Sequence, residues 1–162
     1  MPVTSYAVAL GSNRRHGRHG SPARVLRAAV TAIGMLGEVT ALSQTHATPA
    51  LGPAGRGFAN AVLILRTSLA PPALLGALKD IERRFGRRRG RRWGARVLDL
   101  DIILWSGGAW AGRGLTVPHP AFRSRAFVLV PLAEIAPDWR DPLTGARVRH
   151  LRHAVDRRAP GP

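Results

Sequence analysis

The run VLDLDIILW at residues 97–105 is strongly apolar, yet it carries two aspartates one residue apart. Its length and composition predict a buried strand. Residues i and i+2 of a strand point to the same side, so Asp99 and Asp101 share one face. Leu98 and Leu100 can then pack on the other face. The run therefore predicts a rigid strand that presents two carboxylates at one site.

Burial of these two carboxylates needs compensation, because an ionised carboxylate away from water is costly without a cation or hydrogen bonds. At this spacing the two also repel each other unless a divalent cation lies between them or one takes up a proton. Ligand sets made only of oxygen favour magnesium, usually completed by water and substrate phosphates. The alternative is that Asp99 and Asp101 pair with nearby arginines at a solvated sheet edge. Spacing alone leaves both explanations open.

The rest of the chain predicts one α+β domain. Alternation and helix signals give the order strand, helix, strand, strand, helix, strand, at residues 6–13, 21–37, 39–45, 58–65, 71–86 and 97–105. That order predicts a ferredoxin-like βαββαβ sheet with helices on one face. A C-terminal extension follows, with a short apolar helix at 127–135 and a polar, proline-rich tail from about residue 140. With 162 residues, we expect a single domain over 1–162.

Both helices of this unit have an apolar face at helical spacing. Ser21 offers a cap for the first helix and Pro22 suits its first position. The expected core faces are Leu26, Ala29, Val30 and Ile33 in the first helix, and Leu74, Leu78, Ile81 and Phe85 in the second.

The chain is strongly basic, with 25 Lys and Arg residues against 9 Asp and Glu residues and a formal net charge of +16. This charge attracts polyanions such as phosphorylated small molecules, nucleic acid or an anionic membrane. The absence of cysteine excludes disulfides and thiol catalysis. The chain also has no signal-peptide pattern and no apolar stretch near the ~20 residues that cross a bilayer. We therefore expect a soluble, cytoplasmic protein with no membrane partner.

Eight arginines fall within residues 83–96, a segment that glycines interrupt at positions 86, 90 and 94. A basic loop of this kind beside a metal site suits a triphosphate, whose charge both elements would share. Because the chain has neither GxxxxGK[ST] nor GxGxxG, side chains and metal would have to hold a nucleotide. The alternative is a nucleic-acid-binding patch. Against it, the strand carboxylates would repel a phosphate backbone, and Trp93 is the only aromatic residue among the arginines of 87–96.

Three further side chains are candidates for ligand contacts. Phe58 and Asn60 form another i, i+2 pair, in which the ring could stack on a flat heterocycle while the amide binds its edge. An isolated phenylalanine is more often a core residue, but an amide within FANAVLIL would need a partner if buried. His119 lies between two prolines and could donate to a phosphate oxygen or serve the structure alone.

Five segments resemble one known family in their order and spacing. They are ALGSN at 9–13, TPALGP at 48–53, FANAV at 58–62, RRWGARVLDLDIIL at 91–104 and LTVPHPAFRSRAFVLVPLAEIAP at 115–137. In these segments the chain is similar to the 6-hydroxymethyl-7,8-dihydropterin pyrophosphokinases (2-amino-4-hydroxy-6-hydroxymethyldihydropteridine diphosphokinases) of folate biosynthesis. That family transfers the β,γ-pyrophosphoryl group of ATP to the hydroxymethyl group of a reduced pterin and releases AMP. The resemblance implies this reaction in a monomer, with ATP and the pterin as partners and no specific nucleic acid.

The resemblance also implies roles for individual residues. Catalysis would involve Arg87, Arg89, Asp99 and Asp101, and two Mg²⁺ ions would be bound by Asp99 and Asp101. ATP contacts would come from Glu82, Arg89, Arg92, Trp93, Arg96, Ile102, Thr116, His119 and Arg125. Pterin contacts would come from Thr48, Pro49, Leu51, Phe58, Asn60, Trp93, Asp99 and Phe127, with Phe58 and Phe127 as its two walls. The loop 87–92 would be a catalytic lid.

The chain departs from the family pattern at several points. Ala95 stands where the family usually has proline, and Gly114 where it often has arginine, with Arg113 one position earlier. The lid and the loop before Phe58 are each about one residue shorter, and the basic segment 14–20 also differs. None of these changes touches the aspartate pair, so we expect them to affect affinity and lid geometry. Two other functions stay open: a nucleic-acid-binding ferredoxin-like module, and an inactive family member that binds a partner.

Overall fold

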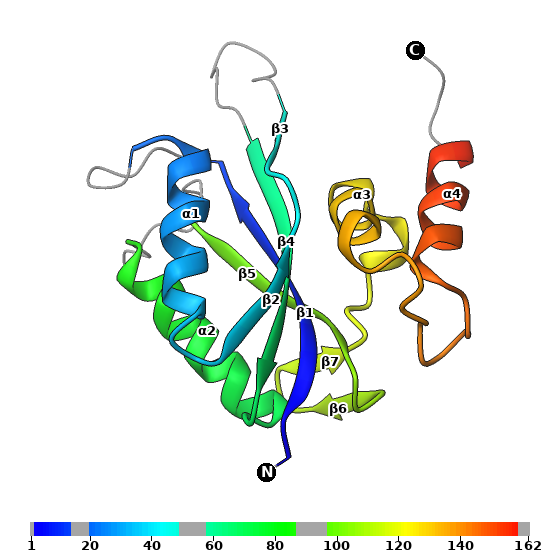
Figure 1. Cartoon of the computed structure of the whole chain (residues 1–162), viewed down its shortest axis with the longest axis horizontal. Helices are drawn as coiled ribbons and strands as arrows, with labels where there is room; N and C mark the ends of the chain where they lie inside the picture. Colours follow the sequence, from blue (N-terminus) through cyan, green and yellow to red (C-terminus); the bar gives the residue numbers. More distant parts are fainter. Residues whose placement is uncertain (1, 14–19, 49–57, 87–96, 159–162) are drawn as a thin grey trace.

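The computed structural model of the chain describes residues 2–13, 20–48, 58–86 and 97–158. Within these ranges it has a five-stranded antiparallel sheet, a two-stranded hairpin and four α-helices (Figure 1). The sheet strands are β1 (Thr4–Ser12), β2 (Glu38–Leu42), β3 (His46–Thr48), β4 (Phe58–Thr67) and β5 (Asp99–Trp105). The hairpin consists of β6 (Trp110–Gly112) and β7 (Leu115–Val117). The helices are α1 (Pro22–Ile33), α2 (Pro71–Arg84), α3 (Ala126–Ile135) and α4 (Val148–Arg158), with a 3-10 turn η1 at Phe122–Ser124.

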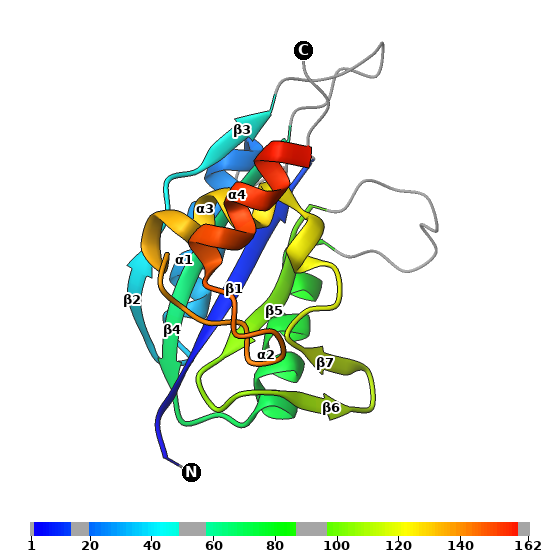
Figure 2. The ribbon, with the colours of Figure 1, turned by 90° about the vertical axis from the view of Figure 1, so that its right-hand side faces the viewer.

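The mixed helix and strand composition is confirmed, and the sheet order is β2-β4-β1-β5 with β3 also paired to β4. The strand predicted at 39–45 corresponds to β2, which ends earlier, at Leu42, and β3 follows it as a separate strand that the sequence pattern does not predict. Helices α1 and α2 cover one face of the sheet, whereas α3 and α4 cover the opposite face (Figures 1 and 2). The expectation of helices on one face therefore holds for α1 and α2 only. The hairpin, and α4 in the polar tail, are elements that the sequence analysis does not predict. No helix in the described ranges combines the length and apolar character needed to cross a bilayer.

Both predicted helix faces are confirmed. The side-chain oxygen of Ser21 accepts a hydrogen bond from the backbone N–H of Arg24 at 3.4 Å, and Pro22 follows as the first residue of α1. The buried residues include Leu26, Ala29 and Ile33 of α1, and Leu74, Leu78, Ile81 and Phe85 of α2 and its end, whereas the predicted Val30 is only partly buried against the same cluster. Gly86 has a φ of 103°, a conformation that favours glycine and ends the second helix.

Strand alternation gives the sheet two apolar faces. The face toward α1 and α2 is formed by alternate strand residues, among them Tyr6, Val8, Leu10, Leu63, Leu65, Leu100 and Ile102. The face toward α3 and α4 is formed by the residues between them, among them Ala7, Val62, Ile64 and Ile103. Further along the strands, this second face continues with Gly11, Asn60 and Asp101, which line a cavity instead of packing under a helix. Incomplete cover by α3 and α4 thus creates the site.

The tail is held to the rest of the domain by a buried carboxylate. Asp141 accepts hydrogen bonds from the guanidinium of Arg123, with Nη2 at 2.8 Å, and from the backbone N–H of Leu143 and the hydroxyl of Thr144. The hydrogen bonds from Arg123 lower the pKa of Asp141 from 3.8 to about 2, although burial acts in the opposite direction. This network joins η1, just before α3, to the segment that leads into α4.

Replacing Asp141 with asparagine should lower the free energy of unfolding at neutral pH by about 2 kcal/mol. The pKa of Asp141 is lower in the folded protein than in the unfolded chain. Its contribution is therefore complete above about pH 4 and is lost as the pH falls through about 2. Urea unfolding of wild type and Asp141→Asn at neutral and acid pH should show a difference that shrinks in acid. Asp138→Asn, at an exposed ion pair with Arg149, is the control and should change little. A difference for Asp141→Asn that does not vary with pH would contradict the prediction.

Candidate active site

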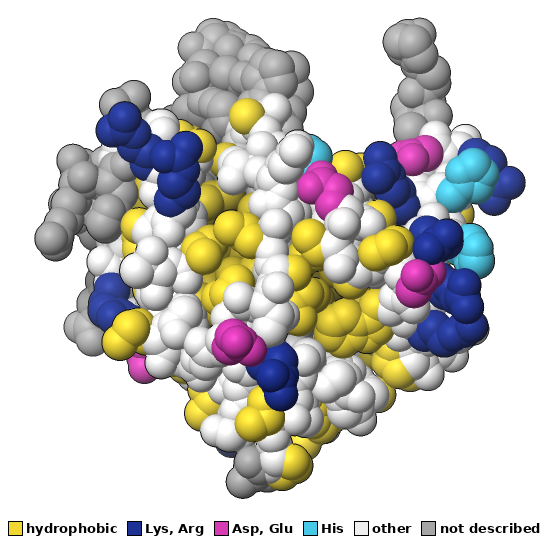
Figure 3. All heavy atoms as spheres, in the orientation of Figure 1, with side chains coloured by type: hydrophobic (Ala, Val, Ile, Leu, Met, Phe, Trp, Pro, Cys, Tyr) yellow, Lys and Arg dark blue, Asp and Glu magenta, His cyan; other side chains and the backbone are white. Residues whose placement is uncertain are grey.

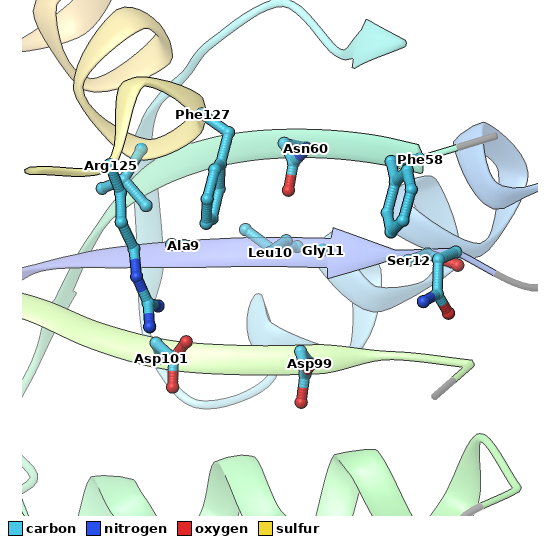
Figure 4. Close-up of a pocket in the computed structure, with 12 residues that line it drawn as sticks. Ala9, Leu10, Gly11, Ser12, Phe58, Asn60, Asp99, Asp101, Arg125 and Phe127 are labelled. Carbon is cyan, nitrogen blue, oxygen red and sulfur yellow. The ribbon is translucent and has the colours of Figure 1, made fainter. Parts of the chain in front are cut away.

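The uncovered end of the sheet forms a cavity of about 620 Å³. Three neighbouring strands make its floor, because Gly11 of β1 lies opposite Asn60 of β4 on one side and Asp99 of β5 on the other. Helix α3 supplies Phe127, and Arg125 directly precedes this helix (Figure 4). The lining residues are Ala9, Leu10, Gly11, Ser12, Asn13, Phe58, Asn60, Asp99, Asp101, Arg125, Phe127 and Val128.

Two aromatic rings form walls of this first cavity. Phe58 is 44% exposed and Phe127 is 51% exposed, so the alternative that Phe58 is a core residue is wrong. Figure 4 shows both rings on the same side of the sheet, with the Asn60 amide between them in this view. The guanidinium carbon of Arg125 lies 5.6 Å from the centroid of the Phe127 ring. A flat heterocycle could stack on these rings while the amide binds its polar edge.

Asp99 and Asp101 project from the same side of β5, as the strand period predicts (Figure 4). Both line the first cavity and also a second cavity of about 400 Å³. The second cavity is lined by Leu75, Lys79, Glu82, Asp99, Leu100, Asp101, Ile102, Gly112, Gly114, Leu115, Thr116, His119 and Pro120. The carboxylates therefore border both cavities, so a group held in one cavity and a group held in the other would both lie beside them.

A buried glutamate of α2 fixes the position of β5. Oε2 of Glu82 accepts a hydrogen bond from the backbone N–H of Leu100 at 2.8 Å. Leu100 lies between the two aspartates, so this bond holds the part of the strand that carries them. Glu82 also lines the second cavity, where the resemblance places ATP.

His119 lines the second cavity, and one of its ring nitrogens accepts a hydrogen bond from the backbone. Its backbone N–H donates to the carbonyl of Ile103 at 3.0 Å, and its Nδ1 accepts from the backbone N–H of Ala121 at 3.1 Å. Burial lowers the pKa of His119; Asp101 raises it and Arg125 lowers it, each by less than burial does. A neutral imidazole whose Nδ1 is an acceptor carries its proton on Nε2. His119 can therefore donate a hydrogen bond from Nε2 to an anion.

The carboxylate pair fits magnesium better than zinc. Across the described residues, no group of three or more His, Cys, Asp or Glu side chains is placed to hold a metal ion. Zinc sites need three or four such ligands. Magnesium is commonly bound by one or two carboxylates, with water and substrate phosphates completing the coordination. Asp99 and Asp101 thus suit an ion that arrives with a phosphorylated substrate.

The structure groups the predicted site residues around the two cavities. Around the first lie Phe58, Asn60, Asp99, Asp101, Arg125 and Phe127, and around the second lie Glu82, Asp99, Asp101, Ile102, Thr116 and His119. Arg125, which the resemblance assigns to ATP, lines the first cavity, and its side chain extends toward Asp101 (Figure 4). Thr48 ends β3 opposite Phe58. The remaining predicted residues, Pro49, Leu51, Arg87, Arg89, Arg92, Trp93 and Arg96, and the lid at 87–92, lie outside the described residues.

Several lining residues have no role in the sequence analysis. Gly11 lies in the ALGSN segment, but nothing in the sequence alone indicates that it separates Asn60 from Asp99 in the sheet. Lys79 is the only lysine of the chain and lines the second cavity. It precedes Glu82 by three residues on α2, so helical spacing could have indicated that both side chains face the same cavity.

One cavity with aromatic walls can hold a flat acceptor, and the adjoining cavity can hold an anionic donor beside two carboxylates and a neutral histidine. Phosphoryl-type transfer needs this alignment of donor and acceptor together with neutralisation of phosphate charge. The fold and the site therefore suit a phosphotransferase with two substrates.

The family model described as 7,8-dihydro-6-hydroxymethylpterin-pyrophosphokinase (HPPK) matches residues 7–137. The chain belongs to this family, a group of pyrophosphokinases, and the resemblance noted in the sequence is confirmed. It is 46% identical over 119 residues to the 2-amino-4-hydroxy-6-hydroxymethyldihydropteridine pyrophosphokinase of Synechocystis sp., with 74% of this chain and 61% of that protein covered. The protein of the same name from Pseudomonas aeruginosa is 45% identical over 138 residues, with 83% and 82% covered.

A solved structure extends the similarity to the fold. The crystal structure of wild-type Plasmodium falciparum HPPK-DHPS has a TM-score of 0.71 with this chain, at 12% sequence identity. The match covers 94% of this chain and 45% of that chain. At such low identity the match supports the fold alone.

Proposed function

We propose that the chain transfers pyrophosphate from ATP to the hydroxymethyl group of 6-hydroxymethyl-7,8-dihydropterin, with release of AMP, as a step of folate biosynthesis. The observation that carries this proposal is that Asp99 and Asp101 line both cavities. An acceptor in one cavity and a nucleotide in the other would meet at these carboxylates. The family model and the names of the relatives support the same reaction.

The pterin would occupy the first cavity. Its flat ring system would stack between Phe58 and Phe127, which are both exposed to the cavity. Asn60 would bind the polar edge of the ring, since an amide offers both a donor and an acceptor. We also propose that Thr48, Pro49 and Leu51 read this edge and that Trp93 closes over it. Of these four, Thr48 belongs to β3, and the other three lie outside the described residues.

ATP would occupy the second cavity. The residues proposed to contact it there are Glu82, Ile102, Thr116 and His119. Nε2 of His119 would donate to a phosphate oxygen, and Arg125, which extends toward Asp101, would bind a phosphate group near the junction of the cavities (Figure 4). The arginines proposed to complete the triphosphate site as a lid are Arg87, Arg89, Arg92 and Arg96, all outside the described residues.

Catalysis would consist mainly of alignment and charge neutralisation. Strand β5 holds Asp99 and Asp101 on one side, and the hydrogen bond from Leu100 to Glu82 fixes this strand segment. Two Mg²⁺ ions bound by the carboxylates would neutralise phosphate charge and lower the pKa of the acceptor hydroxyl. His119, by hydrogen bonding, and Arg125, by its charge, would stabilise negative charge on the transferred pyrophosphoryl group.

We further propose that the unit from β1 to β5 is a ferredoxin-like βαββαβ fold. The support is the antiparallel order β2-β4-β1-β5 with α1 and α2 on one face. The segment from η1 through α4 would then be its C-terminal extension. A single domain over 1–162 is proposed because both apolar clusters use the same central sheet. We also propose that the protein is a cytoplasmic monomer. The support for a monomer is that residues of one chain line both cavities.

AMP formation from ATP, measured with and without the pterin, tests the proposed function. We expect AMP release to require both the pterin and magnesium. ATP consumption that does not depend on the pterin would contradict the proposal. A nucleic-acid-binding module would instead show tight, salt-sensitive binding of RNA or DNA without magnesium. In Figure 3, the described Lys and Arg side chains gather mainly on the right-hand side of the molecule, where Asp, Glu and His side chains lie among them. On this face the basic side chains therefore do not form an uninterrupted stripe of the kind expected for nucleic-acid binding.

Gly11→Ala should weaken pterin binding by about tenfold, because crowding of a packed site costs roughly 1–3 kcal/mol. A Cβ at this position would lie 3.2 Å from Oδ1 of Asn60, so the amide would have to move by a few tenths of an ångström from the position proposed for binding. Gly76→Ala is the matched control, since a Cβ there meets nothing within 4 Å and alanine favours the helix. Calorimetric titration with the pterin should separate the two variants. Equal affinities would show that the amide adjusts without loss of binding.

A further inference from the structure

A carboxylate of α3 joins this helix to the strand segment that borders the first cavity. Oε2 of Glu134 accepts a hydrogen bond from the backbone N–H of Gln44 at 3.1 Å, and Oε1 pairs with Nε2 of His46. The partners are 90 and 88 residues away along the chain, so this bridge is a tertiary contact. One glutamate thus ties α3 both to the segment before β3 and to β3 itself.

Each end of the bridge lies next to one aromatic wall. On the sheet side, His46 lies opposite Asn60, and the same β3–β4 register continues to Phe58. On the helix side, Glu134 follows Phe127 by seven residues, which is about two helical turns, so both side chains leave the same side of α3. The bridge therefore connects the strands beside one wall to the helix that supplies the other wall.

The bridge is not what holds α3 on the sheet. Val128, Leu129 and Leu132 of this helix are buried in the apolar cluster, and that packing fixes the helix to the domain. The side chains of His46 and Glu134 are 37% and 27% exposed, and ion pairs with this exposure contribute little to global stability. Their contacts are local: they join the end of α3 to β3 and to the segment just before it.

We infer that His46 and Glu134 are positioning residues for the pterin, because their pair sets the separation between the walls Phe58 and Phe127. The inference rests on the proposed function, which takes the pterin as the ligand of the first cavity. A ring stacked on both faces loses contact when either wall shifts by a fraction of an ångström, since dispersion attraction falls off steeply. Loss of the bridge should weaken pterin binding and leave ATP binding in the second cavity unchanged.

Glu134→Ala removes both contacts of the bridge and tests the inference. We expect the KM for the pterin to rise about fivefold, with the KM for ATP and the melting temperature close to wild type. His46→Ala should act in the same direction. Glu134→Gln should recover most of the affinity, because its amide oxygen can accept from the backbone N–H of Gln44 while its NH2 donates to Nε2 of a neutral His46. A merely structural role would not separate the two substrates in this way.

Glu38→Ala is the matched control. Glu38 pairs with Arg66 across β2 and β4, at the end of β4 that lies away from Phe58, and both side chains are exposed. This variant should keep the wild-type KM for both substrates. A wild-type pterin KM in Glu134→Ala, or an equal rise in the KM for ATP, would overturn the inference.

Calorimetric titration of the pterin separates failure of this inference from failure of the proposed function. Wild-type protein that neither binds the pterin nor releases AMP would overturn both. An active wild type, together with Glu134→Ala that binds the pterin equally tightly, would overturn the inference alone. An active wild type with weaker binding only in the bridge variants would support both.

Discussion

Asp99→Asn and Asp101→Asn should each lower the rate of AMP formation by about three orders of magnitude or more, while the protein stays folded. Asparagine keeps the size of the side chain but loses the charge that would bind magnesium. Loss of a charge-neutralising metal costs several kcal/mol of barrier, and about 1.4 kcal/mol is a factor of ten in rate. AMP release should be measured at saturating magnesium, with thermal melting of each variant alongside.

The position of the pair makes this result specific. Both aspartates border the two cavities and are only partly buried, on the side of the strand opposite the buried Leu100. Asp80→Asn provides the control, because Asp80 forms an exposed ion pair with Arg83 on α2. That variant should keep wild-type turnover. Near-normal turnover in a folded Asp99→Asn or Asp101→Asn would contradict the metal assignment.

Much of the site follows from the strand period of two. The sequence places Asp99 with Asp101, and Phe58 with Asn60, on common faces, and the structure puts both pairs around one cavity. Local pattern suffices here, because a side chain in a strand points to a side that its neighbours along the chain determine. The apolar run that predicts α3 is equally local.

Helix α4 shows why other parts could not be predicted. The sequence VRHLRHAVDRR is dominated by charged and polar residues, and only three positions face the core. Val148 is buried, while Leu151 and Val155 pack against the cluster that α3 forms with the sheet. So few apolar residues give a weak periodic signal, and the surface that they cover is created by distant segments. Helix α4 is therefore stabilised by tertiary packing more than by its local sequence.

The second cavity depends on long-range contacts in the same way. It combines α2, β5, the hairpin and His119, and the hairpin strands β6 and β7 have only three residues each. Strands this short have no clear alternation in the sequence. The resemblance to a family could name Thr116 and His119, but no pattern within the chain could show that they share a cavity with Glu82.

Phe58→Ala and Phe127→Ala should each weaken pterin binding by roughly 1–3 kcal/mol, the scale of stacking between a nucleic-acid base and an aromatic ring. Affinity for ATP should stay nearly unchanged, because neither ring lines the second cavity. Calorimetric titration with each ligand separately is the measurement. The buried Phe122 is the contrasting position: Phe122→Ala should lower the melting temperature instead, through the cavity it leaves in the core. If ATP affinity falls as far as pterin affinity, Phe58 and Phe127 do not act as walls of the first cavity.

The double variant carries the sharper part of this prediction. If both rings contact one ligand, removal of one wall lets the pterin shift, and the contact with the other wall is then partly lost. Phe58→Ala with Phe127→Ala should therefore cost less than the sum of the two single losses, since residues that share a partner are coupled. Two rings that served separate purposes would give additive losses. The deviation of the binding free-energy losses from additivity thus shows whether both rings contact one ligand between them.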